Sequence, residues 1–191
     1  MTKTNRSQML RMTVGLFTIL VIGLTPTYAA AQDFYSFFNR YTGTALTTGP
    51  LNCDGCMLMT SIFVNSRMQQ WQQMPDTFNL PNGIQISSMA TFRDVDVASH
   101  LSGVPGIPAV QYSQLPFSDL LHIQFQLWTI VQRFVAPNGL PYRWIRNNAT
   151  GLCLQDQGQI GVGGGVMLNP CDPNDWRQQW GVYYHMTGKF Q

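Results

Sequence analysis

The chain has 191 residues and 45% of them are hydrophobic, so it can bury the core of one ordinary domain. Its formal net charge is +2, but three of its eleven basic residues lie within the first eleven positions, whereas all nine acids lie later. Without that basic start the charge is −1 and Lys189 is the only lysine, which excludes a basic nucleic-acid-binding surface.

The first 31 residues have the three parts of a secretory signal. Lys3, Arg6 and Arg11 give a basic start, residues 14–24 form an apolar run, and residues 29–31 are the small residues of an A-x-A cleavage site. The apolar run is too short to span a bilayer. The pattern predicts a cleavable signal peptide at 1–31 and a secreted mature chain, which is periplasmic or extracellular if the source is bacterial.

Short runs rich in aromatic and β-branched residues follow along the exported chain, and each predicts a strand. We expect an opening strand at 34–38, a strand at 69–74, a strand after an Asn-Gly turn at 84–87, one from about Leu121 onward and one at 142–146. The glycine-rich segment 158–165 lacks a phosphate-binding pattern and is expected to be a flexible surface loop.

A Gln-x-Trp motif occurs three times in the exported chain. The tryptophans are 57 and 52 residues apart, so one lies in each third of that chain. Repetition at such a period predicts one structural unit that is used three times. The motif residues are Gln69 and Trp71, Gln126 and Trp128, and Gln178 and Trp180.

Two further motifs occur at nearly fixed sequence distances from the tryptophans. An N-x-x-T-G-x-small-L motif begins at Asn39 and again at Asn147, and its glycine lies 28 residues before Trp71 or 29 before Trp180. Pro-Asn-Gly follows the first two tryptophans, at 81–83 and 137–139, and predicts a hairpin after each.

These motifs resemble the ricin B-type β-trefoil family, and the resemblance covers nearly all of the exported chain. It implies an all-β fold, a β-trefoil of three repeats, in which residues 32–191 form one domain with repeats at about 33–80, 81–136 and 137–191. The Gln-x-Trp motif then has a structural role. Each tryptophan would stabilise the shared core by up to about 5 kcal/mol, and each glutamine would bond neighbouring backbone.

The exported chain keeps four cysteines, and an even number predicts disulfides. The resemblance implies a bridge between Cys153 and Cys171. Cys53 and Cys56 form a C-x-x-C, which could be a redox motif or half a zinc site, but no second Cys/His pair follows at zinc spacing. We favour a small structural disulfide there, and we expect no metal and no cofactor.

In sugar-binding members of the family, an acid just after the C-L pair and an aromatic just before the second cysteine form the pocket. The third repeat has Gln155 where the acid is expected, Asp156 one place on, and Asn169 where the ring is expected. These differences argue against simple galactose binding there.

The other two repeats have different residues at the positions that would contact a sugar. The middle repeat has Asp94 or Asp96 as the acid, Gln111 as an amide and Tyr112 as a stacking platform. The first repeat has Thr47 in the acid position and no acid nearby.

A β-trefoil that has long loops and lacks the usual residues at its sugar-binding positions resembles one branch of the family, the A and C subunits of cytolethal distending toxins. The resemblance implies a secreted, non-catalytic subunit that binds a host-surface glycan or glycoprotein and delivers a nuclease subunit, together with a second trefoil subunit. The alternatives are a free-standing carbohydrate-binding lectin and a secreted, inhibitor-like trefoil that binds protein.

Catalysis finds little support in the sequence. His100, His122 and His185 are the only histidines and fall in different repeats or strands. Asp94 and Asp96 would face one side of a strand, which would suit a paired-carboxylate hydrolase or a calcium site. Because the chain has no glutamate and no second carboxylate cluster, we expect no enzyme activity.

Overall fold

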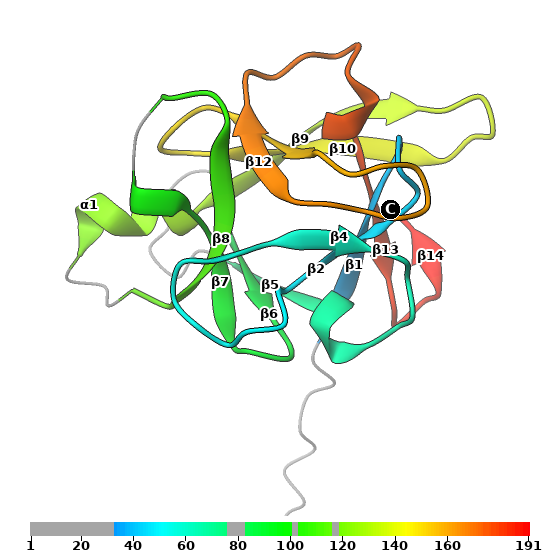
Figure 1. Ribbon diagram of the computed structural model, residues 1–191. Coiled ribbons are helices and arrows are strands. Elements are labelled where there is room, and N and C mark those ends of the chain that lie inside the picture. The colour runs from blue at the N-terminus through cyan, green and yellow to red at the C-terminus, as the bar shows by residue number, and fades with distance from the viewer. Residues whose placement is uncertain (1–32, 76–82, 101–102, 116–118) are drawn as a thin grey trace, which may run out of the picture. The chain divides into compact units, whose positions relative to one another are not determined.

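A computed structural model describes residues 33–75, 83–100, 103–115 and 119–191. The predicted signal peptide and the Pro81-Asn82 turn lie outside the described residues. The described chain is all-β, as predicted, with fourteen strands in one continuous sheet and a single short α-helix (Figure 1). No helix among these residues is long and apolar enough to cross a membrane.

The strands follow one another in three similar groups. The first group is β1 (Tyr35–Asn39), β2 (Ala45–Thr47), β3 (Cys56–Met57), β4 (Met59–Ser61) and β5 (Trp71–Pro75). The second is β6 (Ile84–Ser88), β7 (Arg93–Val97), β8 (Ile107–Ser113) and β9 (Trp128–Val135). The third is β10 (Pro141–Asn147), β11 (Cys153–Asp156), β12 (Val166–Asn169), β13 (Trp180–Tyr184) and β14 (Lys189–Phe190).

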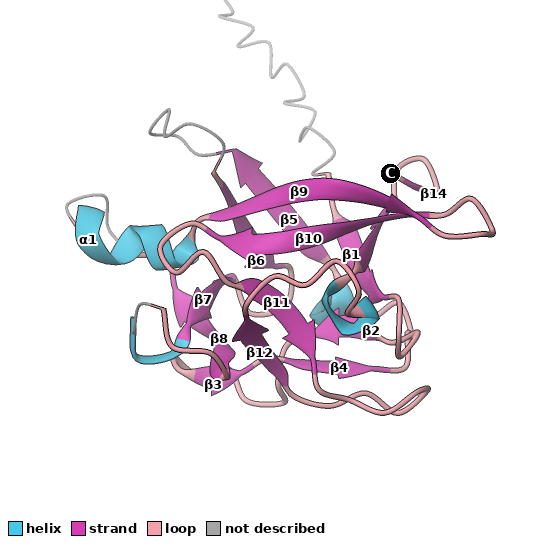
Figure 2. Cartoon of the chain, turned by 90° about the horizontal axis from the view of Figure 1, so that it is seen from above, coloured by secondary structure: helices cyan, strands magenta, loops and turns pink. Residues whose placement is uncertain are grey.

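Six of these strands close into a barrel. β1 pairs with β13 and β5, β6 pairs with β5 and β9, and β10 pairs with β9 and β13. Every tryptophan strand therefore joins the first strand of its own group to the first strand of the next. The hairpins β2–β4, β7–β8 and β11–β12 attach to this ring, and Figure 2 shows the long β9–β10 pair beside them.

The three motif tryptophans lie in the core and make the same hydrogen bond. Each indole is fully buried. The indole N–H of Trp71 donates to the Leu46 carbonyl (3.1 Å). The equivalent bonds run from Trp128 to Val95 (2.8 Å) and from Trp180 to Leu154 (2.9 Å). These three bonds fix which positions of the three repeats correspond.

The motif glutamines close the loops that precede the tryptophan strands. Each side-chain amide donates to one backbone carbonyl and accepts from the N–H two residues further on. The carbonyls belong to Ile62, Ser113 and Pro170, and the N–H groups to Val64, Leu115 and Asp172. A buried loop satisfies its backbone in this way.

Two predicted strand starts are wrong for the same reason. Each glutamine ends a 3₁₀ turn, so the strands begin at Trp71 and Trp128 and not at Gln69 or Leu121. Before Trp128 the chain instead forms α1 (Leu120–Ile123), capped by Asp119, which accepts from the His122 N–H. The turns are η1 (Arg67–Gln69), η3 (Gln124–Gln126) and η4 (Trp176–Gln178), and η2 (Ala98–His100) follows β7.

The glycine-rich segment is closely packed, which the sequence did not reveal. A Cβ on Gly163 would lie 2.0 Å from the Thr60 carbonyl oxygen, and one on Gly158 would lie 2.3 Å from the Gly163 backbone. The Thr60 N–H also donates to the Gly164 carbonyl (2.7 Å). Glycine is therefore required here for close backbone approach between β4 and this segment.

Both cysteine pairs form disulfides, Cys53–Cys56 with Cα atoms 5.5 Å apart and Cys153–Cys171 with Cα atoms 5.1 Å apart. No free cysteine remains. Their sequence separations are 3 and 18 residues, so they restrict the unfolded chain to different degrees.

Replacing Cys153 and Cys171 together by serine is expected to lower the free energy of unfolding by about 3 kcal/mol, because the longer loop regains more entropy when it is opened. Replacing Cys53 and Cys56 together by serine is expected to lower the free energy of unfolding by about half of that amount, because the loop that this disulfide closes is shorter. Urea unfolding of both double variants measures the difference, and an equal loss in the two would contradict the loop-length argument.

Candidate functional site

The acid position of each repeat follows from the indole bonds. Leu46, Val95 and Leu154 are equivalent because each offers its carbonyl to a motif tryptophan. The next residue is therefore Thr47 in the first repeat, Asp96 in the middle repeat and Gln155 in the third. Of the two acids that the sequence left open in the middle repeat, Asp96 and not Asp94 stands in the acid position.

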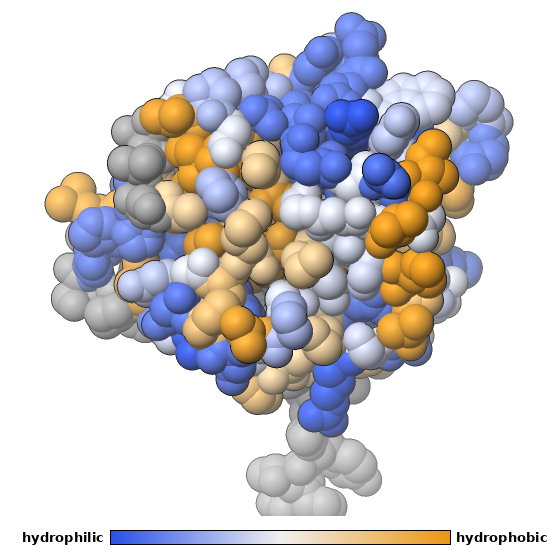
Figure 3. Space-filling view, in the orientation of Figure 1, coloured by the Kyte–Doolittle hydropathy of each residue, from blue (hydrophilic) through white to orange (hydrophobic). Residues whose placement is uncertain are grey.

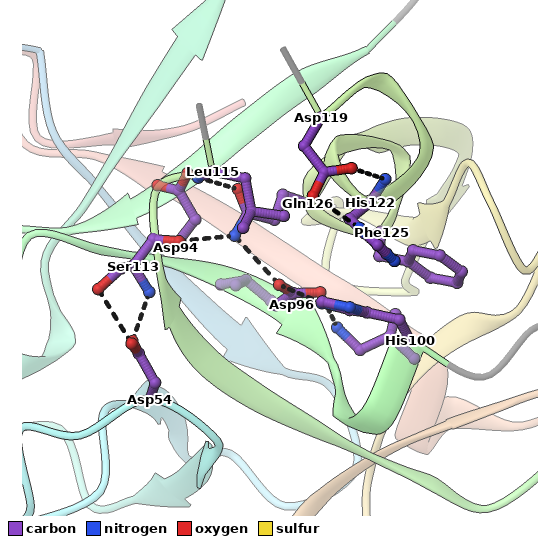
Figure 4. Close-up of polar contacts among 12 residues, drawn as sticks. Asp54, Asp94, Asp96, His100, Ser113, Leu115, Asp119, His122, Phe125 and Gln126 are labelled. Atoms are coloured by element: carbon purple, nitrogen blue, oxygen red, sulfur yellow. Dashed lines mark hydrogen bonds and ion pairs between the residues drawn. The ribbon is translucent and has the colours of Figure 1, made fainter. Parts of the chain in front are cut away.

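The ring position follows from strand pairing. The residue before each indole-bonded carbonyl pairs across its hairpin with Ser61, Tyr112 or Asn169. Only the middle repeat therefore combines a carboxylate with an aromatic ring. We call Asp96, His100, Tyr112, His122, Phe125 and Gln126 the middle-repeat site, and Figure 4 labels all of these except Tyr112.

Asp96 is held by three hydrogen bonds at the end of β7. Its carboxylate accepts from the Val97 N–H (2.6 Å) and from the Gln126 amide (3.0 Å), and it contacts His100 Nε2 at 3.3 Å. Burial raises the pKa of Asp96, while the Val97 bond, His100 and the Gln126 bond act to lower it. In the third repeat Gln178 makes the same contact to Gln155 (3.1 Å), but no charge is present.

His100 contacts Asp96 and is the more exposed of the two. Its φ of 46° is left-handed, and 22% of its side chain is exposed, whereas Asp96 is fully buried. The imidazole lies against Phe125, His122 and Tyr112, with ring centroids 5.2, 4.9 and 5.6 Å away. His100 is therefore a partly exposed side chain that contacts the buried carboxylate and lies among three aromatic or imidazole rings.

Two middle-repeat candidates have internal roles. Asp94 is almost fully buried and accepts from the Ser87 hydroxyl and from the Gln85 amide (3.2 Å). Gln111 faces the other side of the β7–β8 hairpin, where its amide donates to the Leu51 carbonyl. Strand alternation therefore directs Gln111 away from the middle-repeat site. Asp94 shares the face of Asp96 and Tyr112, but it is buried and bonded to Ser87 and Gln85 and does not stand in the acid position.

Asp156 cannot replace the missing acid of the third repeat. It is fully buried, and its carboxylate accepts from four groups. They are the hydroxyls of Thr42 (2.6 Å), Thr44 (3.2 Å) and Thr60 (2.9 Å) and the Gly158 N–H (2.7 Å). The third repeat keeps only Gln155 and Asn169 at the two sugar positions, so it presents neither a carboxylate nor a ring.

Asp94 makes the stability of the domain depend on pH. Burial raises the pKa of Asp94 from 3.8 to about 6; the Ser87 bond opposes this rise and Asp96 adds to it. The folded state therefore holds a proton that the unfolded chain releases near pH 4. We expect the Asp94 contribution, about 3 kcal/mol, to be lost as the pH rises from 4 to 7. Urea unfolding of Asp94→Asn, which cannot ionise, should show a smaller decline, and an unchanged slope would contradict this assignment.

A serine and a histidine also meet at β1, but the hydrogen-bond pattern is wrong for hydrolysis. Ser36 Oγ lies 2.9 Å from His185 Nε2 and donates its proton to the Gln69 carbonyl (2.7 Å). His185 must then donate to Ser36, so it is not a base for that hydroxyl. No group of three or more His, Cys, Asp or Glu side chains that could hold a metal occurs in the described ranges.

Comparison with known proteins identifies the fold. No family model and no curated protein sequence matches this chain. The designed threefold-symmetric protein ThreeFoil matches in structure with a TM-score of 0.64 and 19% identity over 78% of this chain and 96% of its own. A lectin of Polyporus squamosus matches with a TM-score of 0.59 and 18% identity over 80% of this chain and 49% of its own, so the chain spans about half of that lectin.

A toxin structure matches as well. The cytolethal distending toxin of Haemophilus ducreyi has a chain that matches with a TM-score of 0.54 and 15% identity, over 77% of this chain and 80% of that one. With the closed barrel and its three equivalent tryptophans, these matches confirm the predicted β-trefoil fold.

Proposed function

We propose that this chain is an exported, non-catalytic β-trefoil that binds a cell-surface glycan through its middle-repeat site and serves as a delivery subunit of a multi-part toxin. The mature domain is residues 32–191, after removal of residues 1–31. Two disulfides suit an oxidising compartment and so support export.

The pairing of Asp96 with Tyr112 carries the glycan-binding part of the proposal. A carboxylate accepts from two adjacent sugar hydroxyls, and an aromatic ring covers the apolar face of the sugar. Asp96 and Tyr112 stand at the two equivalent positions, and Gln126 orients the carboxylate. Replacement of His100 by a sugar hydroxyl at Asp96 would complete the site.

An exposed apolar surface supports the delivery part of the proposal. Ile62 and Val64 after β4 are 63% and 70% exposed, and Ile160 and Val162 in the adjoining glycine-rich segment are 69% and 67% exposed. Figure 3 shows hydrophobic atoms gathered along this edge of the molecule. Such an area suits contact with another protein subunit, and the structural match to a toxin chain agrees with that use.

One preparation of the oxidised mature chain tests both parts. We expect binding to a subset of glycans on an array, and co-purification with a nuclease when neighbouring genes are co-expressed. If the chain binds one simple sugar and co-purifies with no partner, it is a free-standing lectin and the delivery part of the proposal is wrong. If no glycan on the array is bound but a stable protein complex forms, the glycan-binding part of the proposal is wrong.

A further inference from the structure

The outward face of β10 carries a row of side chains that the middle-repeat site does not use. Ile145 and Asn147 point inward and are fully buried. Tyr142, Trp144 and Arg146 alternate with them and point outward. Residues two apart on a strand are about 7 Å from each other, so these three form a continuous row.

A pocket opens at the Arg146 end of this row. It has a volume of about 260 Å³ and is lined by Val131, Trp144, Arg146, Gly151 and Cys171. A pocket for a drug-sized ligand holds about 300–1,000 Å³, so this one suits a single ring. The buried indole N–H of Trp144 has no partner among the described residues. Buried donors are normally paired, so Trp144 is an exception among the described residues.

Guanidinium groups lie at both ends of the row without a carboxylate partner. Arg146 Nε donates to the Gly151 carbonyl (3.0 Å), which fixes the side chain at the pocket. At the other end Arg40 lies between two rings, 4.3 Å from the Trp176 centroid and 5.4 Å from that of Tyr142. Within the described part of the chain, neither arginine forms an ion pair. A guanidinium that a ring or carbonyl already orients can bind a carboxylate or sulfate through its remaining N–H groups.

We propose that the β10 face is a second binding site, for an acidic saccharide. One sugar ring fills the pocket against Trp144, its acidic group binds Arg146, and the next unit lies along Tyr142 toward Arg40. Trp176 is 52% exposed, and the ring face that Arg40 does not cover suits the apolar face of a sugar. This site shares no residue with the middle-repeat site, so the two proposals can be tested independently of each other.

Tryptophan fluorescence during titration tests the proposal. The probes are sialyllactose and a sulfated chondroitin tetrasaccharide, with lactose as the neutral partner of the first. We expect an acidic probe to bind at least tenfold more tightly than lactose. Arg146→Gln and Trp144→Phe should each weaken that binding at least tenfold. Arg67→Gln removes an exposed arginine from η1 and should leave it unchanged.

The variants also separate this site from the middle repeat. Asp96→Asn should leave binding of the acidic probe unchanged, and unaltered thermal unfolding of Arg146→Gln shows that its fold is intact. Equal affinity for lactose and both acidic probes, insensitivity to Arg146→Gln, or loss of binding in Asp96→Asn would each overturn the proposal. Binding of polyglutamate alone would overturn it in favour of an acidic protein partner.

Discussion

Replacing Asp156 with alanine is expected to lower the free energy of unfolding by about 3–5 kcal/mol. The carboxylate lies on β11, but three of its four donors belong to the first repeat, so it ties the first and third repeats together. These donors are the hydroxyls of Thr42, Thr44 and Thr60. Removing the acceptor breaks four buried hydrogen bonds to a charged group, and the hydroxyls keep only contacts such as Thr42 to Thr44 (2.7 Å) and Thr60 to the Gly164 carbonyl (3.4 Å). A hydrogen bond to a charged group contributes about 1.5–3 kcal/mol.

Urea unfolding at pH 7 measures this loss. Asp172→Ala is the matched control, because that acid is exposed and accepts from one N–H of its own turn, that of Asn174. The control should change stability by no more than about 1 kcal/mol. A midpoint for Asp156→Ala as high as that of the control would show that the network does not stabilise the barrel.

Replacing Asp96 with asparagine is expected to weaken glycan binding by about 10- to 150-fold, the equivalent of about 1.5–3 kcal/mol for a charge-assisted hydrogen bond. The Val97 N–H and the Gln126 amide bond different carboxylate oxygens, so the asparagine oxygen keeps one of these two bonds and loses the other. Thermal unfolding of the variant checks that its fold is intact. Binding of the best array glycan, measured by calorimetry, gives the fold-change.

Asp119→Asn provides the control for this loss. Asp119 lies next to the site and contacts His122 Nδ1 at 2.7 Å, but it does not occupy the acid position. Its removal changes the local charge by the same amount and should alter glycan affinity less than threefold. Equal losses in the two variants would indicate a general effect of charge and not a role for Asp96.

The sequence predicts the barrel well because its markers are local. The β9–β10 hairpin forms around Pro137-Asn138-Gly139, where Gly139 has a φ of 82°, as the Asn-Gly signal indicates. The T-G turns likewise place Gly43 and Gly151 at φ values of 70° and 71°. In each case the residues that set the backbone conformation lie next to one another in the chain.

The middle repeat lacks the T-G motif because its turn uses different residues. Phe92 takes the left-handed φ of 55° that glycine takes in the other repeats, and the Ser88 hydroxyl accepts the turn N–H groups that Asn39 accepts in the first repeat. An exposed phenylalanine gives no sequence signal for such a turn. The sequence therefore leaves Asp94 and Asp96 as alternative acids, and the Trp128 bond to Val95 assigns Asp96.

Contacts between repeats were also beyond the sequence. Asp156 lies 114 residues from Thr42 and 96 from Thr60, and no periodic pattern relates these positions. Its acidic side chain next to Gln155 suggested a surface ligand, whereas burial among hydroxyls gives it a structural role. The contact between His100 and Asp96 could not be predicted from the sequence either, because it depends on a left-handed backbone conformation of His100 after β7.

The most direct test of glycan binding by the middle repeat is a titration of the ¹⁵N-labelled mature chain with the best array glycan, followed through the indole N–H resonances. Trp71, Trp128 and Trp180 give one reporter in each repeat, because each indole bonds the carbonyl that precedes the acid position. We expect the Trp128 resonance to shift and those of Trp71 and Trp180 to stay. A shift at Trp180 or Trp71 with Trp128 unmoved would contradict the account.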